Sequence, residues 1–436
     1  MTGCAADHEF GQVERWQAFQ DALLRRHIAY LGEYSPFYRR RFAEGGLTTA
    51  VGAGRADLTH YPLTTKDDLA RCGAEFLCVP AEQVADICLT SGTTGEPVAM
   101  LQTVADLERL ARNEAMSFRA AGIAPGDRVL IATTLDRCFM AGLAYCLGLN
   151  RLGATVIRGG SNSLPYLAEL VRRQQPRAII GVPTLLLALA CRLQAAGGAG
   201  LDGVTTLIGI GEPLRRDDLT LSPLGERLRQ AWGGAKILST YASTEMATAF
   251  TDCREGCGGH LLPELMVVEI LDAKGQAVPP GVVGEVVATP LQVTGMPLLR
   301  FCTGDLAALH VAPCSCGRTT PRLGPVVGRK AQMLKVRGTT LYPPAIAAAL
   351  QELPAVRGHY LEVHAEFDLS DRLLVVVGSD DPQLSVAEVA EAIAVRIRVK
   401  PEVKILPVAE VLRRTVQEDQ RKPVTFFDYR KPAISD

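Results

Sequence analysis

The sequence lacks the long apolar runs and the charge imbalance that mark several classes of protein. No stretch of the 436 residues reaches the roughly 18 uninterrupted apolar positions of a transmembrane helix. The first residues form neither a basic nor an apolar segment, so we expect no secretory signal and a cytoplasmic location. Lys and Arg total 46 and Asp and Glu total 47, a net charge of −1. We therefore expect no binding of nucleic acid or of an anionic membrane.

The composition is that of a folded, multidomain protein. Apolar residues make up 47% of the chain and charged residues 21%, which excludes a disordered chain and a collagen-like fibre. The 12 cysteines are scattered. Without an export signal, they are expected to be free thiols or metal ligands rather than disulfides.

Short β-rich segments alternate with helical stretches between residues 85 and 240. This order predicts βαβ units and a doubly wound, mostly parallel sheet. The predicted strands are 87–90, 128–132, 155–157, 178–182, 206–210 and 236–240. The predicted helices between them are 105–121, 139–152, 163–175, 183–196 and 217–232.

The flanking segments have other patterns. Residues 10–45 are predicted to be helical up to Pro36, and a further helix is predicted to start at Thr65. Closely spaced strands at 266–312 predict an antiparallel β-subdomain. After Gly328 the pattern predicts a compact α+β module. We therefore expect a large α/β domain at 1–327 and a small α+β domain at 328–436.

One segment has the composition of a phosphate-binding loop. Residues 89–97 read Leu-Thr-Ser-Gly-Thr-Thr-Gly-Glu-Pro and directly follow a predicted strand. Glycines let the backbone turn tightly, and hydroxyl and N–H groups can surround phosphate oxygens. An ordinary Ser/Thr/Gly turn is the alternative from composition alone. The segment is not a Walker motif, because the G-K-[ST] ending is absent.

Four further segments follow in a recognisable order. They are Gly209-Ile210-Gly211-Glu212-Pro213, Thr240-Tyr241-Ala242-Ser243-Thr244-Glu245, Leu299-Arg300-Phe301-Cys302-Thr303-Gly304-Asp305 and Gly328-Arg329. Each is weak alone. Together they offer a ring to stack on a base, carboxylates for a metal and a ribose, and an Arg for negative oxygens.

This order resembles the adenylate-forming superfamily of acyl- and aryl-CoA synthetases, luciferases and adenylation domains. The phenylacetate–CoA ligase branch is the most similar, on Ser35-Pro36-Phe37-Tyr38-Arg39-Arg40 and Pro62-Leu63-Thr64-Thr65-Lys66-Asp67-Asp68-Leu69. The resemblance implies the adenylate-forming fold. It also implies an AMP-forming acid–thiol ligase that uses ATP, Mg²⁺ and CoA.

The resemblance assigns a role to each matching residue. For the nucleotide phosphates it implies Ser91, Gly92, Thr93, Thr94 and Gly95. For the adenine it implies Glu212, Pro213 and Tyr241, and a core aromatic is the alternative for Tyr241. For the α-phosphate and Mg²⁺ it implies Thr244 and Glu245. For the ribose and the domain hinge it implies Asp305 and Arg329.

The resemblance also implies a catalytic lysine near the C-terminus. Lys422 stands six residues before Asp428, as in the family pattern, and would bridge the substrate carboxylate and the α-phosphate. A solvated tail lysine is the alternative. Glu418 and Asp419 replace a usually Gly-rich loop. Two other departures are Ala242, in place of a Gly, and Ala331, in place of a hinge acid.

Cysteine and histidine recur where a second metal could bind. Cys253, His260, Cys314 and Cys316 could form a tetrahedral, structural zinc site. C-x-C is not a common zinc knuckle, but members of the resembled branch have similar residues at similar places. Cys257 is an alternative ligand, and buried thiols with a surface His are the alternative to any metal.

Three functions remain open from the sequence. The first is a carboxylate–CoA ligase for a compact apolar acid, aryl or arylacetic, with Phe139 and Met140 beside the acid. The second is a free-standing adenylation enzyme that loads the phosphopantetheine thiol of a carrier protein. Lys335-Val336-Arg337-Gly338 suits CoA phosphates slightly better. The third is a non-catalytic nucleotide-binding relative. A homodimer is a further possibility.

Overall fold

The computed structural model describes residues 8–47, 54–90, 97–336, 339–367, 370–416 and 423–430. The chain divides into two compact units. The first comprises Met1–Thr303 and Ala307–Pro325, and the second comprises Gly304–Leu306 and Val326–Asp436. Among the described residues, no helix combines the length and the apolarity that crossing a bilayer requires.

The first unit begins with three helices and a β-hairpin. These elements are α1 (Val13–Tyr34), α2 (Pro36–Glu44), α3 (Lys66–Cys72), β1 (Val84–Leu89) and β2 (Ala99–Thr103). Pro36 starts α2 as well as ending the preceding helix, because Ser35 caps α2 by accepting a hydrogen bond from the Tyr38 N–H. The predicted start of α3 is confirmed, since Thr65 caps it in the same way through Asp68.

A six-stranded sheet forms the centre of the first unit, in the order β4-β3-β5-β6-β7-β8. All its neighbouring strands are parallel except β7 and β8. Its strands are β3 (Arg128–Ala132), β4 (Thr155–Arg158), β5 (Ala178–Gly181), β6 (Thr206–Ile210), β7 (Lys236–Ser243) and β8 (Thr248–Thr251). The predicted mostly parallel sheet is therefore confirmed.

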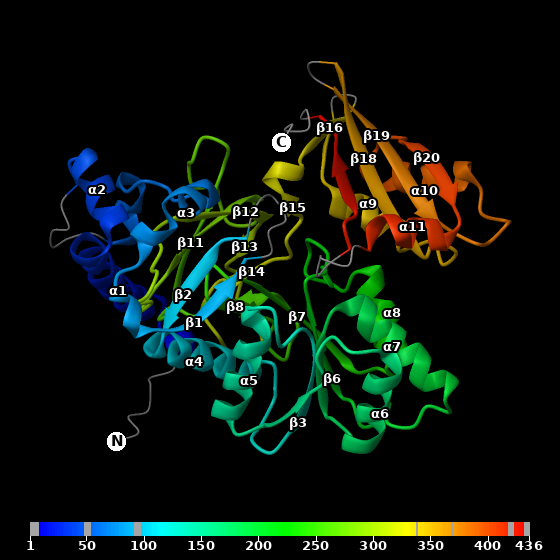
Figure 1. Cartoon of the computed structure of the whole chain (residues 1–436), viewed down its shortest axis with the longest axis horizontal. Helices are drawn as coiled ribbons and strands as arrows, with labels where there is room; N and C mark the ends of the chain where they lie inside the picture. Colours follow the sequence, from blue (N-terminus) through cyan, green and yellow to red (C-terminus); the bar gives the residue numbers. More distant parts are fainter. Residues whose placement is uncertain are drawn as a thin grey trace. The chain divides into compact units, whose positions relative to one another are not determined.

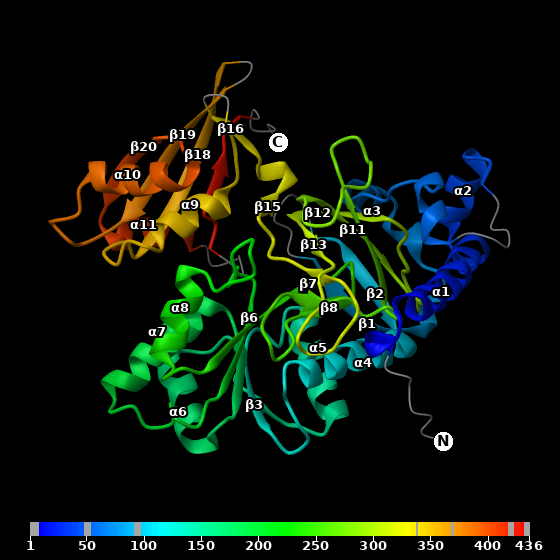
Figure 2. The ribbon, with the colours of Figure 1, turned by 180° about the vertical axis from the view of Figure 1, so that it is seen from behind.

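Helices cover both faces of this sheet (Figure 1). They are α4 (Val104–Ala120), α5 (Met140–Leu152), α6 (Leu164–Gln174), α7 (Pro183–Ala195) and α8 (Pro223–Ala231). Alternate residues of β3 point to opposite faces. Leu130 packs with α6, α7 and α8, whereas Val129 and Ile131 pack with α4 and α5. The view from behind shows the same two layers (Figure 2).

The β-subdomain consists of short antiparallel strands. They are β9 (Gly259–His260), β10 (Met266–Leu271), β11 (Gly284–Pro290), β12 (Phe301–Ala307), β13 (Leu309–His310) and β14 (Arg322–Leu323). One sheet has the order β13-β14-β9. In the other, β10 pairs with β11 along its whole length. The predicted antiparallel subdomain is confirmed.

The second unit is built around a four-stranded sheet in the order β20-β19-β18-β21. Its elements are β15 (Gly328–Arg329), β16 (Leu334–Val336), β17 (Thr339–Leu341), α9 (Pro343–Leu350), β18 (Gly358–Phe367), β19 (Ser370–Gly378), α10 (Val386–Ile397), β20 (Glu402–Leu406), α11 (Val408–Thr415) and β21 (Phe426–Asp428). Val375 and Val377 pack towards α9 and α10, and Val376 packs against α11. This is the predicted α+β module.

Two predictions of local structure are wrong. The segment 87–90 was expected to join the parallel sheet, but β1 pairs antiparallel with β2 in a separate two-stranded sheet. The helix expected at 217–232 begins at Pro223, because Arg215 and Leu221 form a β-bridge and Ser222 then caps α8.

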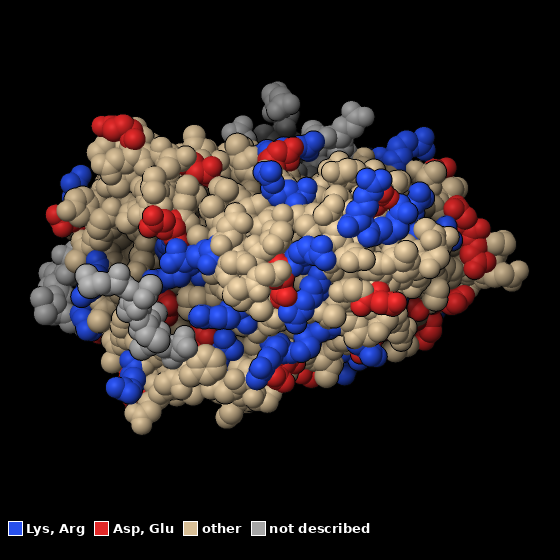
Figure 3. Space-filling view, turned by 90° about the horizontal axis from the view of Figure 1, so that it is seen from below, with Lys and Arg blue, Asp and Glu red and all other residues tan. Residues whose placement is uncertain are grey.

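Charged side chains of both signs lie on the face of the molecule drawn in Figure 3. On the face drawn in Figure 3, Lys and Arg side chains are spread widely, with Asp and Glu side chains among them. This distribution agrees with the near-zero net charge of the sequence.

Candidate active site and cysteine–histidine cluster

Thr244 and Glu245 lie in the connection between β7 and β8 of the first unit. Glu245 is only 7% exposed. Its carboxylate Oε1 lies 3.8 Å from the ammonium of Lys66, the first residue of α3. Thr244 and Glu245 also line a cavity of about 20 Å³ together with residues of β2 and α4. The buried carboxylate of Glu245 is therefore paired with the ammonium of Lys66 at this position.

Arg109 of α4 holds the backbone on both sides of this connection. Its guanidinium donates to the Ala247 and Leu291 carbonyls, at 2.6 Å each, to the Leu265 carbonyl at 2.7 Å, and to the Thr248 hydroxyl at 2.9 Å. Burial lowers the pKa of Arg109 to about 9. Ala247 has a left-handed φ of 45°, a strained conformation for a residue with a Cβ. Arg109 stabilises that conformation.

The residues expected at the adenine lie at the ends of β6 and β7. Glu212 follows β6, and its carboxylate accepts from the Thr184 N–H and hydroxyl at 2.9 Å each. Pro213 is the next residue and is exposed. Tyr241 lies on β7 and stacks on Phe250, with 6.2 Å between the ring centres. Because β6 and β7 are parallel neighbours, their carboxyl ends lie at one edge of the sheet.

Asp305 and Arg329 lie together in the second unit. They are directly opposite each other where β12 pairs with β15. Arg329 donates from Nε to the Asp305 carboxylate at 3.2 Å. The two candidate ribose contacts are therefore adjacent, and their positions are set by an antiparallel strand pair.

Arg300, in the same sequence segment as Asp305, has a structural role. Its guanidinium donates to both oxygens of Glu269, at 2.8 and 3.0 Å, and to the Tyr61 carbonyl at 2.7 Å. It is buried and has a φ of 48°. Arg300 therefore holds the start of β12 rather than offering charge to a ligand.

Six predicted site residues lie outside the described residues. They are Ser91, Gly92, Thr93, Thr94, Gly95 and Lys422. The described residues on either side of the 91–96 segment are hydrogen-bonded to each other, since the Thr90 N–H donates to the Val98 carbonyl at 3.0 Å. Beside the 417–422 segment, which contains Lys422, the Val424 N–H donates to the Thr415 carbonyl at 2.8 Å.

The strand that follows the Lys422 segment is tied to its own domain by Arg430. The Arg430 guanidinium donates to both oxygens of Asp428, at 2.7 and 2.8 Å. It also donates to Asp371 and to the Met333 carbonyl, at 3.0 Å each. These contacts give a structural reason for the Asp-x-Arg pair at the end of β21.

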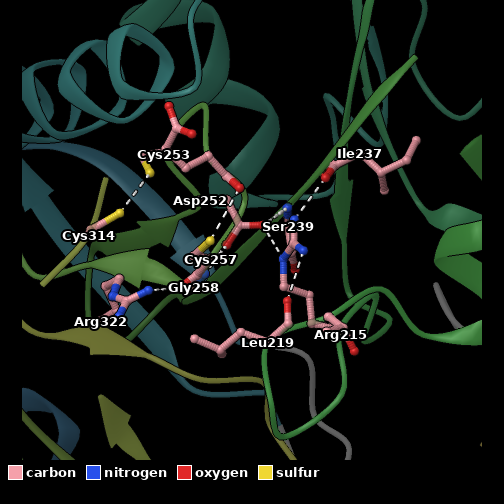
Figure 4. Close-up of polar contacts among 12 residues, drawn as sticks. Arg215, Leu219, Ile237, Ser239, Asp252, Cys253, Cys257, Gly258, Cys314 and Arg322 are labelled. Carbon is pink, nitrogen blue, oxygen red and sulfur yellow. Dashed lines mark hydrogen bonds and ion pairs between the residues drawn. The ribbon is translucent and has the colours of Figure 1, made fainter. Parts of the chain in front are cut away.

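Four dispersed metal-ligand side chains meet in the β-subdomain. The ligand atoms of Cys253, His260, Cys314 and Cys316 all lie within 4.8 Å of one another. The Cys253 and Cys314 sulfurs are 3.8 Å apart (Figure 4), and the Cys316 sulfur lies 3.4 Å from His260 Nε2. We call these four residues the Cys₃His cluster. Cys257 is not part of it, and its sulfur faces the Glu255 carbonyl at 3.3 Å.

A buried ion pair positions the loop that begins with Cys253. Asp252 accepts from Arg215 at 2.7 Å, from the Ser239 N–H at 2.8 Å and from the Gly258 N–H at 2.9 Å. Figure 4 shows Asp252 between these partners, next to Cys253. The loop is therefore fixed to β7 through Ser239 by contacts of the protein itself.

The orientation of the His260 ring is set by a contact of its Nδ1. Its Nδ1 lies 3.2 Å from the Thr320 carbonyl, which sets Nδ1 as the donor and leaves Nε2 towards Cys316. Burial lowers the pKa of His260 to about 4, so the imidazole is neutral at physiological pH. Neutral imidazole is the form that binds a metal.

The chain is similar in sequence to proteins of a known family. Residues 50–295 match the model of the family described as AMP-binding enzyme. The chain belongs to this family. The chain is 32% identical over 375 residues to a phenylacetate-coenzyme A ligase of Thermus thermophilus, covering 84% of this chain and 82% of the relative. It is 30% identical to the phenylacetate-coenzyme A ligase of Escherichia coli, covering 86% and 85%.

Solved structures have the same fold as this chain. A 2-hydroxyisobutyryl-CoA ligase in the postadenylation state superposes with a TM-score of 0.85 at 23% identity, covering 98% of this chain and 94% of that one. The predicted superfamily, its phenylacetate–CoA ligase-like branch and the adenylate-forming fold are therefore confirmed.

Sequence reasoning missed three residues around Glu245. Lys66 lies within the Pro62–Leu69 segment that carries the family resemblance, and none of the motifs includes Arg109 or Gln102. Gln102 is a β2 residue that lines the cavity with Glu245. Nothing in the spacing of a helix Arg or a strand Gln indicates proximity to a turn about 140 residues later. The polarity of these buried positions is the only signal that the sequence carries.

Proposed function

We propose that the protein joins a carboxylic acid to CoA in two steps, using ATP. In the first step a carboxylate oxygen attacks the α-phosphorus of ATP, and pyrophosphate leaves. In the second step the thiolate of CoA attacks the acyl carbonyl, and AMP leaves. The relatives named as phenylacetate-coenzyme A ligases support this proposal. The observation that carries it is the buried Glu245 carboxylate at the carboxyl end of β7, with Thr244 beside it.

The chemistry explains why such residues are required. A carboxylate is a poor electrophile, and the adenylate supplies a good leaving group. Negative charge increases at the phosphorus in the transition state, so preorganised cations and donors accelerate the step. Lys422 is our candidate for that cation, and the 91–95 segment is our candidate for holding the outgoing phosphates.

The surroundings of Glu245 fit a magnesium ion. Mg²⁺ prefers carboxylate and water oxygens, and Glu245 is a buried carboxylate whose ion-pair partner among the described residues is the half-exposed Lys66. When bound, Mg²⁺ would neutralise phosphate charge. Glu245 would hold the ion, and Thr244 would contact the α-phosphate.

Asp305 and Arg329 form our proposed ribose site. A carboxylate accepts hydrogen bonds from both ribose hydroxyls, and such charge-assisted bonds are strong. The existing contact between Arg329 and Asp305 keeps the carboxylate oriented. We further propose that residues 1–327 form the adenylation domain and that residues 328–436 form a domain that rotates between the two steps, as hinged enzymes do.

We propose one structural zinc ion in the Cys₃His cluster. Three thiol sulfurs and one imidazole nitrogen make a complete tetrahedral donor set, with no position left for substrate. The 4.8 Å limit on the distances between ligand atoms agrees with such a set. The zinc would join the loop after β8 to the segment between β13 and β14, and it would take no part in the reaction.

We infer an aryl or arylacetic acid as the substrate. The predicted acid-facing segment contains Phe139 and the buried Met140, which suit a compact apolar group. CoA is our preferred acceptor over a carrier protein, because the sequence places Lys335 and Arg337, the latter outside the described residues, where their positive charges would suit its phosphates. A cytoplasmic location and a homodimer stay predictions.

The proposal is tested by incubating the protein with ATP, Mg²⁺, CoA and a panel of aryl, arylacetic and short aliphatic acids. Mass spectrometry then measures AMP and acyl-CoA. Equal amounts of AMP and acyl-CoA with an aryl acid would support the proposal and name the acid. Acyl-adenylate without acyl-CoA would favour carrier-protein loading. The absence of AMP with every acid, together with ATP binding, would favour the non-catalytic alternative.

A further inference from the structure

Arg322 is a buried arginine beside the Cys₃His cluster. It is 6% exposed and stands directly opposite His260 where β14 pairs with β9. Side chains of residues that are opposite each other on neighbouring strands lie on one face of the sheet. The Arg322 side chain therefore lies on the same side of this sheet as the imidazole of the cluster.

The guanidinium of Arg322 joins the two segments that supply the cysteine ligands. It donates to the Cys257 carbonyl at 2.7 Å (Figure 4) and to the Ala312 carbonyl at 2.9 Å. Cys257 lies in the loop that begins with Cys253, and Ala312 stands just before Cys314 in the second segment. Arg322 therefore fixes both ligand-bearing segments to β14.

The charge of Arg322 is not balanced by a carboxylate. Within the part of the chain that the structure describes, its hydrogen-bond acceptors are neutral carbonyls, and no acidic side chain forms an ion pair with it. Arg318 also lies at the cluster and donates to the Cys316 sulfur at 3.7 Å, but it is paired with the buried carboxylate of Glu9. A buried charge without an opposite charge is costly. The surroundings of Arg322 therefore suit an anionic centre.

A zinc ion in the Cys₃His cluster would create such a centre. Zinc binds cysteine as the thiolate and histidine as the neutral imidazole, so the thiol protons pass to the solvent when the metal binds. Three thiolates carry one more negative charge than Zn²⁺ neutralises, and the loaded centre is a monoanion. Neutral thiols without the metal offer no charge of this kind.

We propose that Arg322 is the counter-cation of the zinc centre, balancing its negative charge while its hydrogen bonds hold both ligand-bearing segments. The inference rests on the zinc ion of the proposed function and adds to it a residue outside the ligand set. Arg322 is a positioning residue, not a ligand. Losing a residue that supports metal ligands in this way typically weakens metal binding by about 10–100-fold.

Two variants separate the charge of Arg322 from its hydrogen bonds. Arg322→Gln keeps a neutral donor and loses the charge, whereas Arg322→Lys keeps the charge and loses the planar fork. Zinc affinity, measured by competition with a chromogenic chelator, should fall by about tenfold or more in Arg322→Gln and by clearly less in Arg322→Lys. The thiolate-to-cobalt absorption of the Co²⁺-loaded variants should match the wild type, because the four ligands are unchanged.

Melting temperatures give a second readout. An arginine that is only structural would stabilise the zinc-loaded and the EDTA-treated protein equally, and by linkage its loss would leave zinc affinity unchanged. We expect Arg322→Gln to lower the melting temperature more in the zinc-loaded form. Arg254→Gln is the control, since Arg254 follows Cys253 but is exposed and paired with Glu255. It should change neither zinc affinity nor melting.

The outcomes distinguish this role from the proposals on which it rests. Equal zinc affinity in Arg322→Gln and the wild type would overturn the role of Arg322 alone. Equal losses in the Gln and Lys variants would assign the effect to the hydrogen bonds and overturn the charge balance. If Arg322→Gln does not fold, a loss of about tenfold or more in Arg322→Lys would overturn it instead.

The wild-type protein tests the zinc site itself. A wild type that binds neither zinc nor cobalt would overturn the zinc centre and the role of Arg322 together. Acyl-CoA formation by the same preparation would leave the proposed ligase function standing, because the zinc takes no part in the reaction.

Discussion

The Lys66 ammonium lies 3.8 Å from the buried carboxylate of Glu245. The two residues are far apart in sequence, on α3 and in the β7–β8 connection. Lys66 is 43% exposed, so solvent screens the pair and it adds at most about 1 kcal/mol to stability. The ion pair therefore mainly sets the charge around Glu245 and contributes little to the stability of the fold.

The first prediction concerns Glu245. Glu245→Gln should lower pyrophosphate release by about 10²–10³-fold, because the neutral amide is a poor magnesium ligand. The melting temperature should stay close to that of the wild type, since the lost ion pair is weak. Glu108→Gln, on the exposed side of α4, is the control. Full activity of Glu245→Gln at ordinary Mg²⁺ concentrations would show that another residue holds the ion.

Lys422 carries the second prediction. Lys422→Ala should abolish adenylation and spare thioester formation from a supplied acyl-adenylate, because the lysine acts only on the α-phosphate and the free carboxylate. The two half-reactions are measured separately, by pyrophosphate release and by acyl-CoA formation. Lys400→Ala, an exposed lysine paired with Glu391, should change neither. Equal loss of both half-reactions would refute the assigned role.

The third prediction concerns Arg109. Arg109→Lys should lower the free energy of unfolding by about 2–4 kcal/mol, because a lysine cannot reach four acceptors on different elements and leaves buried carbonyls unsatisfied. Urea denaturation measures the loss. Arg192→Lys, exposed on α7, should be neutral. An unfolding free energy for Arg109→Lys within 0.5 kcal/mol of wild type, roughly the range of surface substitutions, would contradict the importance of these contacts.

Zinc content is the subject of the fourth prediction. Elemental analysis should find about one zinc per chain, as expected for a four-ligand site. Cys316→Ser should lose the metal and lower the melting temperature of the first unit. Cys257→Ser should keep the metal, because its sulfur lies outside the cluster. Zinc loss in Cys257→Ser with retention in Cys316→Ser would reverse the ligand assignment.

The fifth prediction follows from Glu114, which is fully buried on α4. Burial raises the pKa of Glu114 to about 8 from its ordinary 4.5. The folded state thus holds a proton that the unfolded chain releases, so this group contributes stability below pH 4.5 that is lost as the pH rises towards 8. Glu114→Gln removes the titration. Its melting temperature should exceed that of the wild type by more at pH 8 than at pH 5.

A pH-independent difference between Glu114→Gln and the wild type would contradict this reading of Glu114. The exposed Glu108→Gln, on the same helix, should show the same pH dependence of melting as the wild type. The slope expected for one group is about 1.4 kcal/mol per pH unit between the two pKa values.

The regular elements could be predicted because their causes are local. Apolar residues of the central strands are buried on both faces, so they form short continuous runs such as residues 129–132, and helical stretches with caps separate them. The predictions at 87–90 and 217–232 are wrong because pairing with another segment of the chain determines the local structure there. β1 pairs with β2 across the 91–96 segment, and the Arg215–Leu221 bridge delays α8.

The sequence alone determined the family, the α/β and α+β division, and the identity of Glu245, Asp305 and Arg329 as candidate ligand contacts, because ordered motifs with fixed spacing carry that information. Only the tertiary structure decided that Lys66 pairs with Glu245 and that Gln102 lines the same cavity. It also decided that Arg109 binds the Ala247 carbonyl, and that Cys253 rather than Cys257 meets Cys314. These contacts join distant segments through the packing of α3, α4 and β2 around the β7–β8 connection. Local spacing specifies elements, whereas the meeting of side chains depends on how those elements pack.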